Sequence, residues 1–95
     1  MNKCIKIMWY IPNHKVESAL LSTIQHTADK LSVEGILCAK SPQLFEIMAA
    51  GNKEAVDKFL DEMYQIIEIP QNLGNLEIIA SAKERDYRGI FRIMI

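Results

Sequence analysis

Few residues in this chain have the types and spacing that a catalytic or metal-binding site requires. Its two cysteines, Cys4 and Cys38, are 34 positions apart, and neither belongs to a C-x-x-C pair or to a Cys/His cluster. A zinc site needs about four converging ligands at short spacings, so the sequence predicts no metal site. Both cysteines lie in apolar, strand-like runs, where a free cysteine behaves as a small hydrophobic residue. We therefore expect two reduced, buried thiols, which is typical of a cytoplasmic protein.

No set of side chains predicts a catalytic centre. His14 and His26 are 12 positions apart, without a serine or cysteine nucleophile or an orienting carboxylate nearby, and we expect both to be exposed. Glu46 and Lys6 fall on the same face of two predicted strands, which would place an acid near a base. In a sheet this arrangement is more often a cross-strand ion pair than a catalytic dyad. The sequence thus predicts no catalytic residue.

Four basic residues lie close together near the C-terminal end, and Glu84 and Asp86 between them partly offset their positive charge. We interpret the segment as a solvated loop that leads into an edge strand, with an anion-binding site as the alternative. The basic members are Lys83, Arg85, Arg88 and Arg92.

Composition limits the classes of protein that remain. The chain has 95 residues, of which 49% are hydrophobic and 24% charged, as expected for one globular domain spanning 1–95. The formal net charge of -1 argues against a nucleic-acid surface, which needs a dominant basic face. No apolar run approaches the roughly 20 residues of a membrane helix, and the N-terminus does not resemble a signal peptide. We expect a cytoplasmic protein that binds neither nucleic acid nor membrane.

Hydrophobic periodicity predicts seven elements that would hold these side chains. Residues 3–10 alternate with period two, which indicates a strand, whereas 53–67 carries a single apolar stripe at helical spacing. The remaining elements are predicted as a helix at 14–31 and strands at 33–39, 44–49, 76–81 and 89–95. This order is the ferredoxin-like βαββαβ plan with an additional C-terminal strand, in the α+β class. Because each helix has one stripe, both should pack on one face of an antiparallel sheet.

Alternation assigns the strand residues to two faces. The helix-covered face receives a core set together with Phe59 of the second helix: Ile5, Ile7, Trp9, Phe45, Ile47 and Ala49. The opposite, open face is more apolar than a solvated surface usually is, and we expect it to be covered by a second copy in a homodimer. The predicted partner interface is Cys4, Lys6, Met8, Tyr10, Leu44, Glu46, Met48 and Ile79, and Glu77 shares the face. A dimer that exchanges the terminal segment 89–95 is the structural alternative.

Part of the chain resembles the acylphosphatase family. The resemblance lies in AxxLxVxG at 28–35, FEI at 45–47, GNKEAVDKFL at 51–60 and FRI at 91–93. It implies the ferredoxin-like fold and, for an active enzyme, a glycine-rich phosphate loop, an arginine clamp and an asparagine that positions water. In this chain the loop region, 13–19, has no glycine, and the clamp and water positions fall on Leu21 and Ala39. We therefore expect no acylphosphatase activity.

The chain also resembles the flavin-binding blue-light sensor (BLUF) domains. The shared segments are GILC at 35–38, LFEIM at 44–48, EAV at 54–56 and ERDYRGIF at 84–91. The resemblance implies a flavin pocket between helices and sheet, lined here by Trp9, Glu46 and either Thr27 or Ala28. These replace the family's tyrosine, glutamine and asparagine, and a glutamate has no amide donor. Two hypotheses remain: a non-enzymatic binding or assembly module without cofactor, and a protein that holds a flavin or another small molecule.

Overall fold

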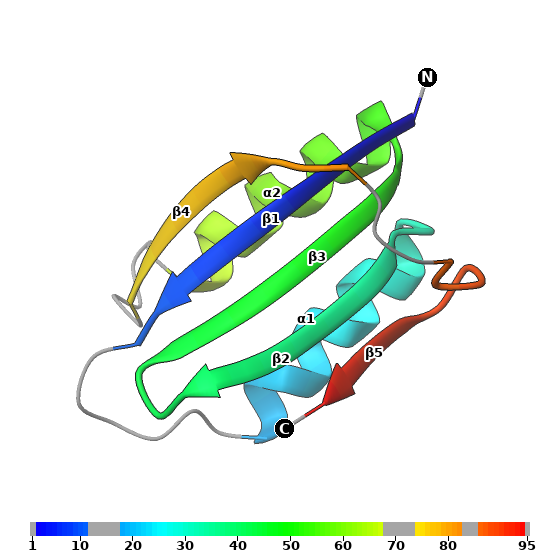
Figure 1. Cartoon of the computed structure of the whole chain (residues 1–95). Coiled ribbons are helices and arrows are strands. Elements are labelled where there is room, and N and C mark those ends of the chain that lie inside the picture. The colour runs from blue at the N-terminus through cyan, green and yellow to red at the C-terminus, as the bar shows by residue number, and fades with distance from the viewer. Residues whose placement is uncertain (1, 12–17, 68–73, 83–85, 95) are drawn as a thin grey trace.

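The computed structural model describes residues 2–11, 18–67, 74–82 and 86–94 of the chain, which form two helices and a five-stranded sheet (Figure 1). The elements are β1 (Asn2–Tyr10), α1 (Ser18–Lys30), β2 (Glu34–Ser41), β3 (Leu44–Asn52), α2 (Lys53–Ile67), β4 (Asn75–Ala80) and β5 (Phe91–Met94). Neither helix is long and apolar enough to cross a membrane within the described ranges.

The strand order is β4-β1-β3-β2-β5, which confirms the βαββαβ plan with an added strand. The first four strands in this order pair antiparallel, but β5 pairs parallel with β2. The prediction of a wholly antiparallel sheet was therefore wrong. The chain leaves the sheet after β4 at one edge and re-enters it at the other edge, where β5 runs in the same direction as β2. Hydrophobic periodicity does not reveal strand direction, so it could not distinguish parallel from antiparallel pairing.

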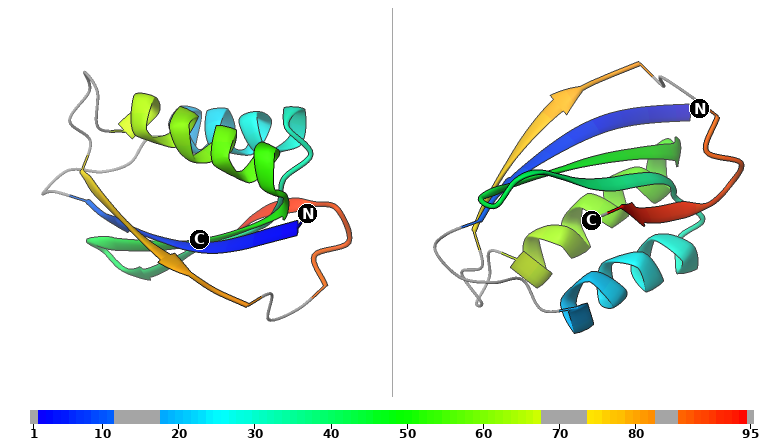
Figure 2. Two further views of the ribbon diagram at one scale, coloured as in Figure 1. Left: turned by 90° about the horizontal axis from the view of Figure 1, so that it is seen from above. Right: turned by 60° about the horizontal axis from the view of Figure 1, so that its bottom comes forward.

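The two helices cover one face of the sheet, and the opposite face carries no helix (Figure 2). The inward-facing residues predicted on β1 are confirmed: Ile5, Ile7 and Trp9 are 2%, 0% and 0% exposed. The α2 stripe also points inward, with Val56, Phe59, Met63 and Ile67 each 0% exposed. Burial of these apolar side chains is the main force that holds the helices on the sheet.

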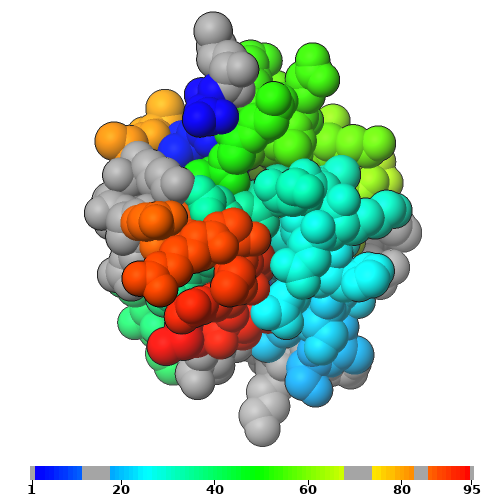
Figure 3. Space-filling view, turned by 90° about the vertical axis from the view of Figure 1, so that its right-hand side faces the viewer, coloured from blue at the N-terminus to red at the C-terminus, as the bar shows by residue number. Residues whose placement is uncertain are grey.

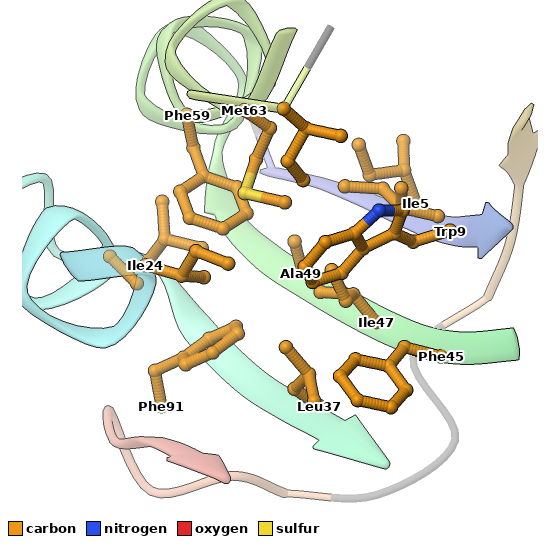
Figure 4. Packing of buried hydrophobic residues seen from close by; sticks show 14 of the residues in the cluster. Ile5, Trp9, Ile24, Leu37, Phe45, Ile47, Ala49, Phe59, Met63 and Phe91 are labelled. Atoms are coloured by element: carbon orange, nitrogen blue, oxygen red, sulfur yellow. The ribbon is translucent and has the colours of Figure 1, made fainter. Parts of the chain in front are cut away.

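Aromatic side chains join the elements of the core (Figure 4). The rings of Phe59 on α2 and Phe91 on β5 have centroids 5.7 Å apart, and Trp9 meets Phe45 edge-to-face at 5.2 Å. In the space-filling view, β5 lies beside α1 (Figure 3), and the Gln25 side-chain amide donates a 2.9 Å hydrogen bond to the Phe91 carbonyl. These contacts fix the short added strand against both layers.

Strand β3 runs three residues further than the predicted range, 44–49. Gly51 pairs with Lys3 and Asn52 with Asn2, so the Gly-Asn pair extends the strand before the chain turns. The Asn52 side chain then accepts a 2.9 Å hydrogen bond from the Glu54 amide, which caps α2. For the first helix, residues 14–17 of the predicted range lie outside the described residues.

A charged cluster ties α2 to β1 on the helix-covered side. The carboxylate of Asp57 accepts hydrogen bonds from Lys3 Nζ at 2.5 Å and from Lys53 Nζ at 2.9 Å. The hydrogen bond from Lys3, followed by that from Lys53, lowers the pKa of Asp57 below its usual value. A carboxyl group whose pKa is lowered by folding adds stability above its unfolded pKa, and this stability is lost as the pH falls through the folded pKa.

We therefore expect Asp57→Asn to lower the melting temperature at neutral pH, with a difference that shrinks as the pH falls below the usual value of 3.8. Thermal unfolding followed at several pH values measures this. Asp61→Asn, an exposed change on the same helix, is the matched control. A melting-temperature difference for Asp57→Asn that stays constant down to strongly acidic pH would contradict the role of the cluster.

Candidate functional site

The open face of the sheet is the candidate functional site. Strand register arranges its side chains in rows that cross the sheet, with one residue from each strand. The Lys6 row consists of Ile79, Lys6, Met48, Ile36 and Arg92. The Glu46 row, next to it, consists of Glu77, Met8, Glu46, Cys38 and Met94. Beyond the Glu46 row lies a third row that includes Tyr10 and Leu44.

Exposed apolar side chains are spread over this face. Tyr10 and Ile79 are each 42% exposed, and Met94 is 58% exposed. Met48, predicted as part of the interface, is only 3% exposed in the single chain. It lies on the central strand between Lys6 and Ile36, so its neighbours already cover it. Met48 therefore has little surface left for a partner to bury, which corrects its assignment as an exposed interface residue.

The connection between β4 and β5 is attached to one end of the open face (Figure 1). The Ser81 amide donates to the Cys4 carbonyl at 3.2 Å, and the Gly89 amide donates to the Glu34 carboxylate at 2.6 Å. Tyr87, in the same connection, is buried with 7% of its surface exposed. Of the predicted interface residues, Cys4 thus lies at the end bonded to this connection, where Cys4, Glu34 and Ser81 line a hollow of about 380 Å³. The free part of the face consists of the Lys6 row, the Glu46 row and the row of Tyr10.

The predicted ion pair between Lys6 and Glu46 is not among the ion pairs of the described residues. Lys6 lies directly opposite Met48, whereas Glu46 lies opposite Met8. Glu46 instead approaches Lys40 at 4.0 Å. The two charges are diagonal neighbours, so each remains available to a partner.

The three residues of the implied ligand pocket do not converge. Trp9 is paired with Phe45 on the helix-covered face, whereas Glu46 is one residue further along β3 and points to the open face. Thr27 lies on α1, and its hydroxyl donates to the Thr23 carbonyl at 2.8 Å. Glu46 therefore cannot line a pocket between helices and sheet together with Trp9, because alternate strand residues point to opposite faces.

The space between helices and sheet is filled by apolar side chains (Figure 4). Trp9, Ile24, Ile47 and Phe59 are each 0% exposed there. No polar or charged side chain is buried among the described residues. A ring system with several polar atoms needs several buried hydrogen-bond partners, and the indole N–H of Trp9 is the one polar side-chain group among these four residues.

The two positions that the sequence resemblance assigned to the acylphosphatase clamp and water-positioning residue lie on α1 and β2. Leu21 is half-buried near the start of α1, and Ala39 is exposed near the end of β2. Neither side chain can bind phosphate or orient water. His26 is exposed, as predicted, while His14 and the loop 12–17 lie outside the described residues.

Two of the four clustered basic residues line a hollow of about 280 Å³ beside β2 and β5. Arg88 and Arg92 share this hollow with Gly35, Ile36, Asp86, Tyr87 and Met94. Lys83 and Arg85 lie outside the described residues. Asp86 accepts a hydrogen bond from the Arg88 amide at 2.8 Å, so the hollow is not purely basic.

Both cysteines are reduced thiols and only half-buried, so the expectation of buried thiols was wrong. They lie on the open face, with Cys4 paired to Ala50 and Cys38 paired to Glu46. No group of three or more histidine, cysteine or carboxylate side chains that could hold a metal ion occurs in the described part of the chain.

Sequence reasoning missed the half of the open face that β2 and β5 contribute. Ile36 and Cys38 project from β2, and Arg92 and Met94 project beside them from β5. Their alternation was visible in the sequence, but their place next to the predicted interface depends on the strand order. Only the parallel pairing of β5 with β2 extends both rows to the far edge.

Comparison with solved structures identifies similar folds. An acylphosphatase from Bacillus subtilis is 18% identical, with a TM-score of 0.74 and 100% of both chains covered. An acylphosphatase from Coxiella burnetii is 17% identical, with a TM-score of 0.73 over 98% of this chain and 93% of that one. Klebsiella pneumoniae BlrP1, solved with FMN and cyclic diGMP, is 18% identical with a TM-score of 0.70 over 99% of this chain. The match covers 25% of the BlrP1 chain.

No protein-family model matches the sequence, and no curated protein matches it either. Structural likeness at 17% and 18% identity establishes a common fold. The likeness extends over 100% of this chain for the Bacillus subtilis acylphosphatase and over 99% for BlrP1. The chain therefore has the ferredoxin-type α+β fold that acylphosphatases share with the BLUF-domain proteins.

Proposed function

We propose that this protein is a non-enzymatic assembly module that forms a homodimer through its open sheet face. The observation that carries the proposal is the set of exposed apolar side chains on that face, led by Met94 at 58% and by Tyr10 and Ile79 at 42% each. A soluble monomer rarely leaves large apolar side chains from several strands of one sheet face in water. A second copy is the simplest cover, because isologous dimers are the commonest closed assembly.

The dimer through the sheet face is favoured over exchange of the terminal strand. In the single chain, Phe91 is 0% exposed and β5 is in register with its own β2. Strand exchange would have to break and remake this packing, whereas association of the open faces leaves it intact.

Met8→Lys is expected to weaken the dimer, because a charge would lose its hydration where a thioether is packed. Ser22→Lys, on the exposed side of α1, is the control for the added charge. Sedimentation velocity at matched concentrations compares the two variants with the parent protein. A Met8→Lys variant that dimerises as well as the Ser22→Lys variant would overturn the proposed interface.

Catalysis is not part of the proposed function. Leu21 and Ala39 stand where a phosphate clamp and a water-positioning residue would be needed, and neither has a polar side chain. We expect no hydrolysis of a generic acyl phosphate above the uncatalysed rate. Turnover of about 1 s⁻¹, a low ordinary enzymatic rate, would contradict this part of the proposal.

The alternative function is a small-molecule carrier, and it is favoured by the likeness to BlrP1, a protein solved with FMN. The apolar packing between helices and sheet argues against it. The visible absorption spectrum of the freshly purified protein separates the two functions. Flavin bands that remain with the protein during gel filtration would favour the carrier, and a colourless dimer would favour the assembly module.

The partner and location of the protein follow from the same proposal. The net charge of -1 and the mixed charges of the open face are suited to another protein surface rather than to nucleic acid or membrane. Two free cysteines agree with a reducing compartment, so we place the dimer in the cytoplasm.

A further inference from the structure

We propose that the two copies pack face to face about a two-fold axis that crosses the strands between the Lys6 row and the Glu46 row. This inference rests on the proposed homodimer and specifies its geometry. Rotation about such an axis places the Lys6 row of one copy on the Glu46 row of the other copy, with each strand over the same strand. Lys6 then lies over Met8 of the other copy and Glu46 over Met48, so Lys6 and Glu46 are diagonal neighbours across the interface.

Charge is the first observation that selects this axis. The charged members of the Lys6 row are both basic, Lys6 and Arg92, whereas those of the Glu46 row are both acidic, Glu46 and Glu77. In the proposed dimer each basic row faces an acidic row, and the contact occurs twice by symmetry. None of these four residues except Glu46 takes part in an ion pair between described residues, and Glu46 is 4.0 Å from Lys40.

Shape is the second observation, and it is independent of charge. Met94 is the most exposed of the large apolar side chains in the described ranges, at 58%. The same rotation carries Met94 of one copy over Arg92 of the other, which lines the hollow of about 280 Å³ with Ile36 and Tyr87. Met94 of the same copy, Asp86 and Arg88 also line this hollow, so the protruding thioether of each copy lies at the rim of its partner's hollow.

The position of the axis along the strands leaves the row of Cys4 and Glu34 outside the two paired rows. Ser81 and Gly89 bond to Cys4 and Glu34 in that row, which is adjacent to the Lys6 row. A rotation about an axis between the rows makes the strands of the two sheets antiparallel. Two sheets that pack face to face keep their strand directions within about 30° of each other, and this arrangement satisfies that preference.

The competing axis runs along β3, and it fails on charge. Rotation about β3 brings Glu46 onto Glu46 of the other copy, and Lys6 onto Ile36. Like charges that approach in an interface repel each other and lose hydration without gaining a partner. The two geometries therefore predict opposite effects of neutralising Glu46.

Charge reversal tests the proposed axis. Lys6→Glu and Glu46→Lys should each weaken the homodimer by at least about tenfold, since close charge pairs across interfaces couple strongly. An equimolar mixture of the two variants should form a heterodimer, because Glu at position 6 of one copy then lies diagonally across the interface from Lys at position 46 of the other, and the native residues keep the same relation on the other side. Lys58→Glu and Asp61→Lys, exposed changes on α2 with the same charge differences, should leave the dimer intact.

Glu46→Gln separates the two axes directly. Its dimer should be weaker than that of the parent protein if the acidic Glu46 row faces the basic Lys6 row, and tighter if Glu46 faces its own copy. Sedimentation equilibrium at low salt gives the dissociation constants, and thermal unfolding checks that each variant is folded. A parent protein that remains monomeric would overturn the proposed homodimer itself. A parent dimer unaffected by either charge reversal, or tightened by Glu46→Gln, would overturn only the axis.

Discussion

Replacing Phe59 by alanine is expected to lower the free energy of unfolding by about 3–5 kcal/mol. The side chain is 0% exposed on α2 and meets the ring of Phe91 at a centroid distance of 5.7 Å. Removing the ring takes away its transfer free energy and leaves a cavity that the sheet and both helices cannot close. A domain of this size has a total stability of about 5–14 kcal/mol, so the loss is a large part of it.

Denaturant unfolding of the parent protein and the variant measures the effect of Phe59→Ala. Lys58→Ala, at the neighbouring exposed position, is the control and should change the stability by less than about 0.5 kcal/mol. A Phe59→Ala protein that unfolds at nearly the same denaturant concentration as Lys58→Ala would refute the assigned packing of α2.

Gly35→Ala is the second change with a large expected effect, of about 2–5 kcal/mol. A Cβ atom at this position would lie 1.7 Å from the backbone oxygen of Met48 on the neighbouring strand. The φ angle of +154° adds strain for any residue with a side chain. Because the obstacle is backbone, β2 and β3 would have to move apart at the centre of the sheet.

Gly89→Ala provides the matched control for Gly35→Ala. Gly89 also has a positive φ, +71°, but a Cβ atom added there would meet no heavy atom within 4 Å. Its replacement should therefore cost only the backbone strain, about 1–2 kcal/mol. If thermal and denaturant unfolding gave equal losses for the two alanine variants, close approach of the strands at Gly35 would not be the cause.

Hydrophobic periodicity predicted the elements that bury one continuous face. The α2 range 53–67 agrees with Lys53–Ile67, and the alternation in β1 placed Ile5, Ile7 and Trp9 correctly in the core. These predictions succeed because burial on a helix or strand leaves a period in the sequence. Strand β3 was predicted too short because a Gly-Asn pair is more typical of turns, yet here it continues the ladder before capping α2.

Which residues lie together on the open face could be determined only from the structure. Nothing in the residues 89–95 indicates whether the terminal strand runs parallel or antiparallel, or which edge it joins. The pairing of β5 with β2 decides that Arg92 extends the Lys6 row and that Met94 extends the Glu46 row. Burial of Met48 likewise depends on its position on the central strand, between residues far away in the sequence.

The residues of the implied ligand pocket do not lie together, and the reason is local. Glu46 follows Phe45, which points into the core, so Glu46 must point to the open face. The resemblance to the BLUF domains matched sequence segments, but the alternation of β3 determines which side chains face the helices. The same rule that predicted the core thus excludes Glu46 from a pocket beside Trp9.

The central claim is that the open sheet face joins two copies of this chain. Static light scattering of the parent protein across a concentration series tests it most directly. We predict a mass that rises from that of one 10.9 kDa chain toward twice that value with increasing concentration. A mass that stays at one chain at about 100 μM, well above micromolar dissociation constants, would contradict the claim.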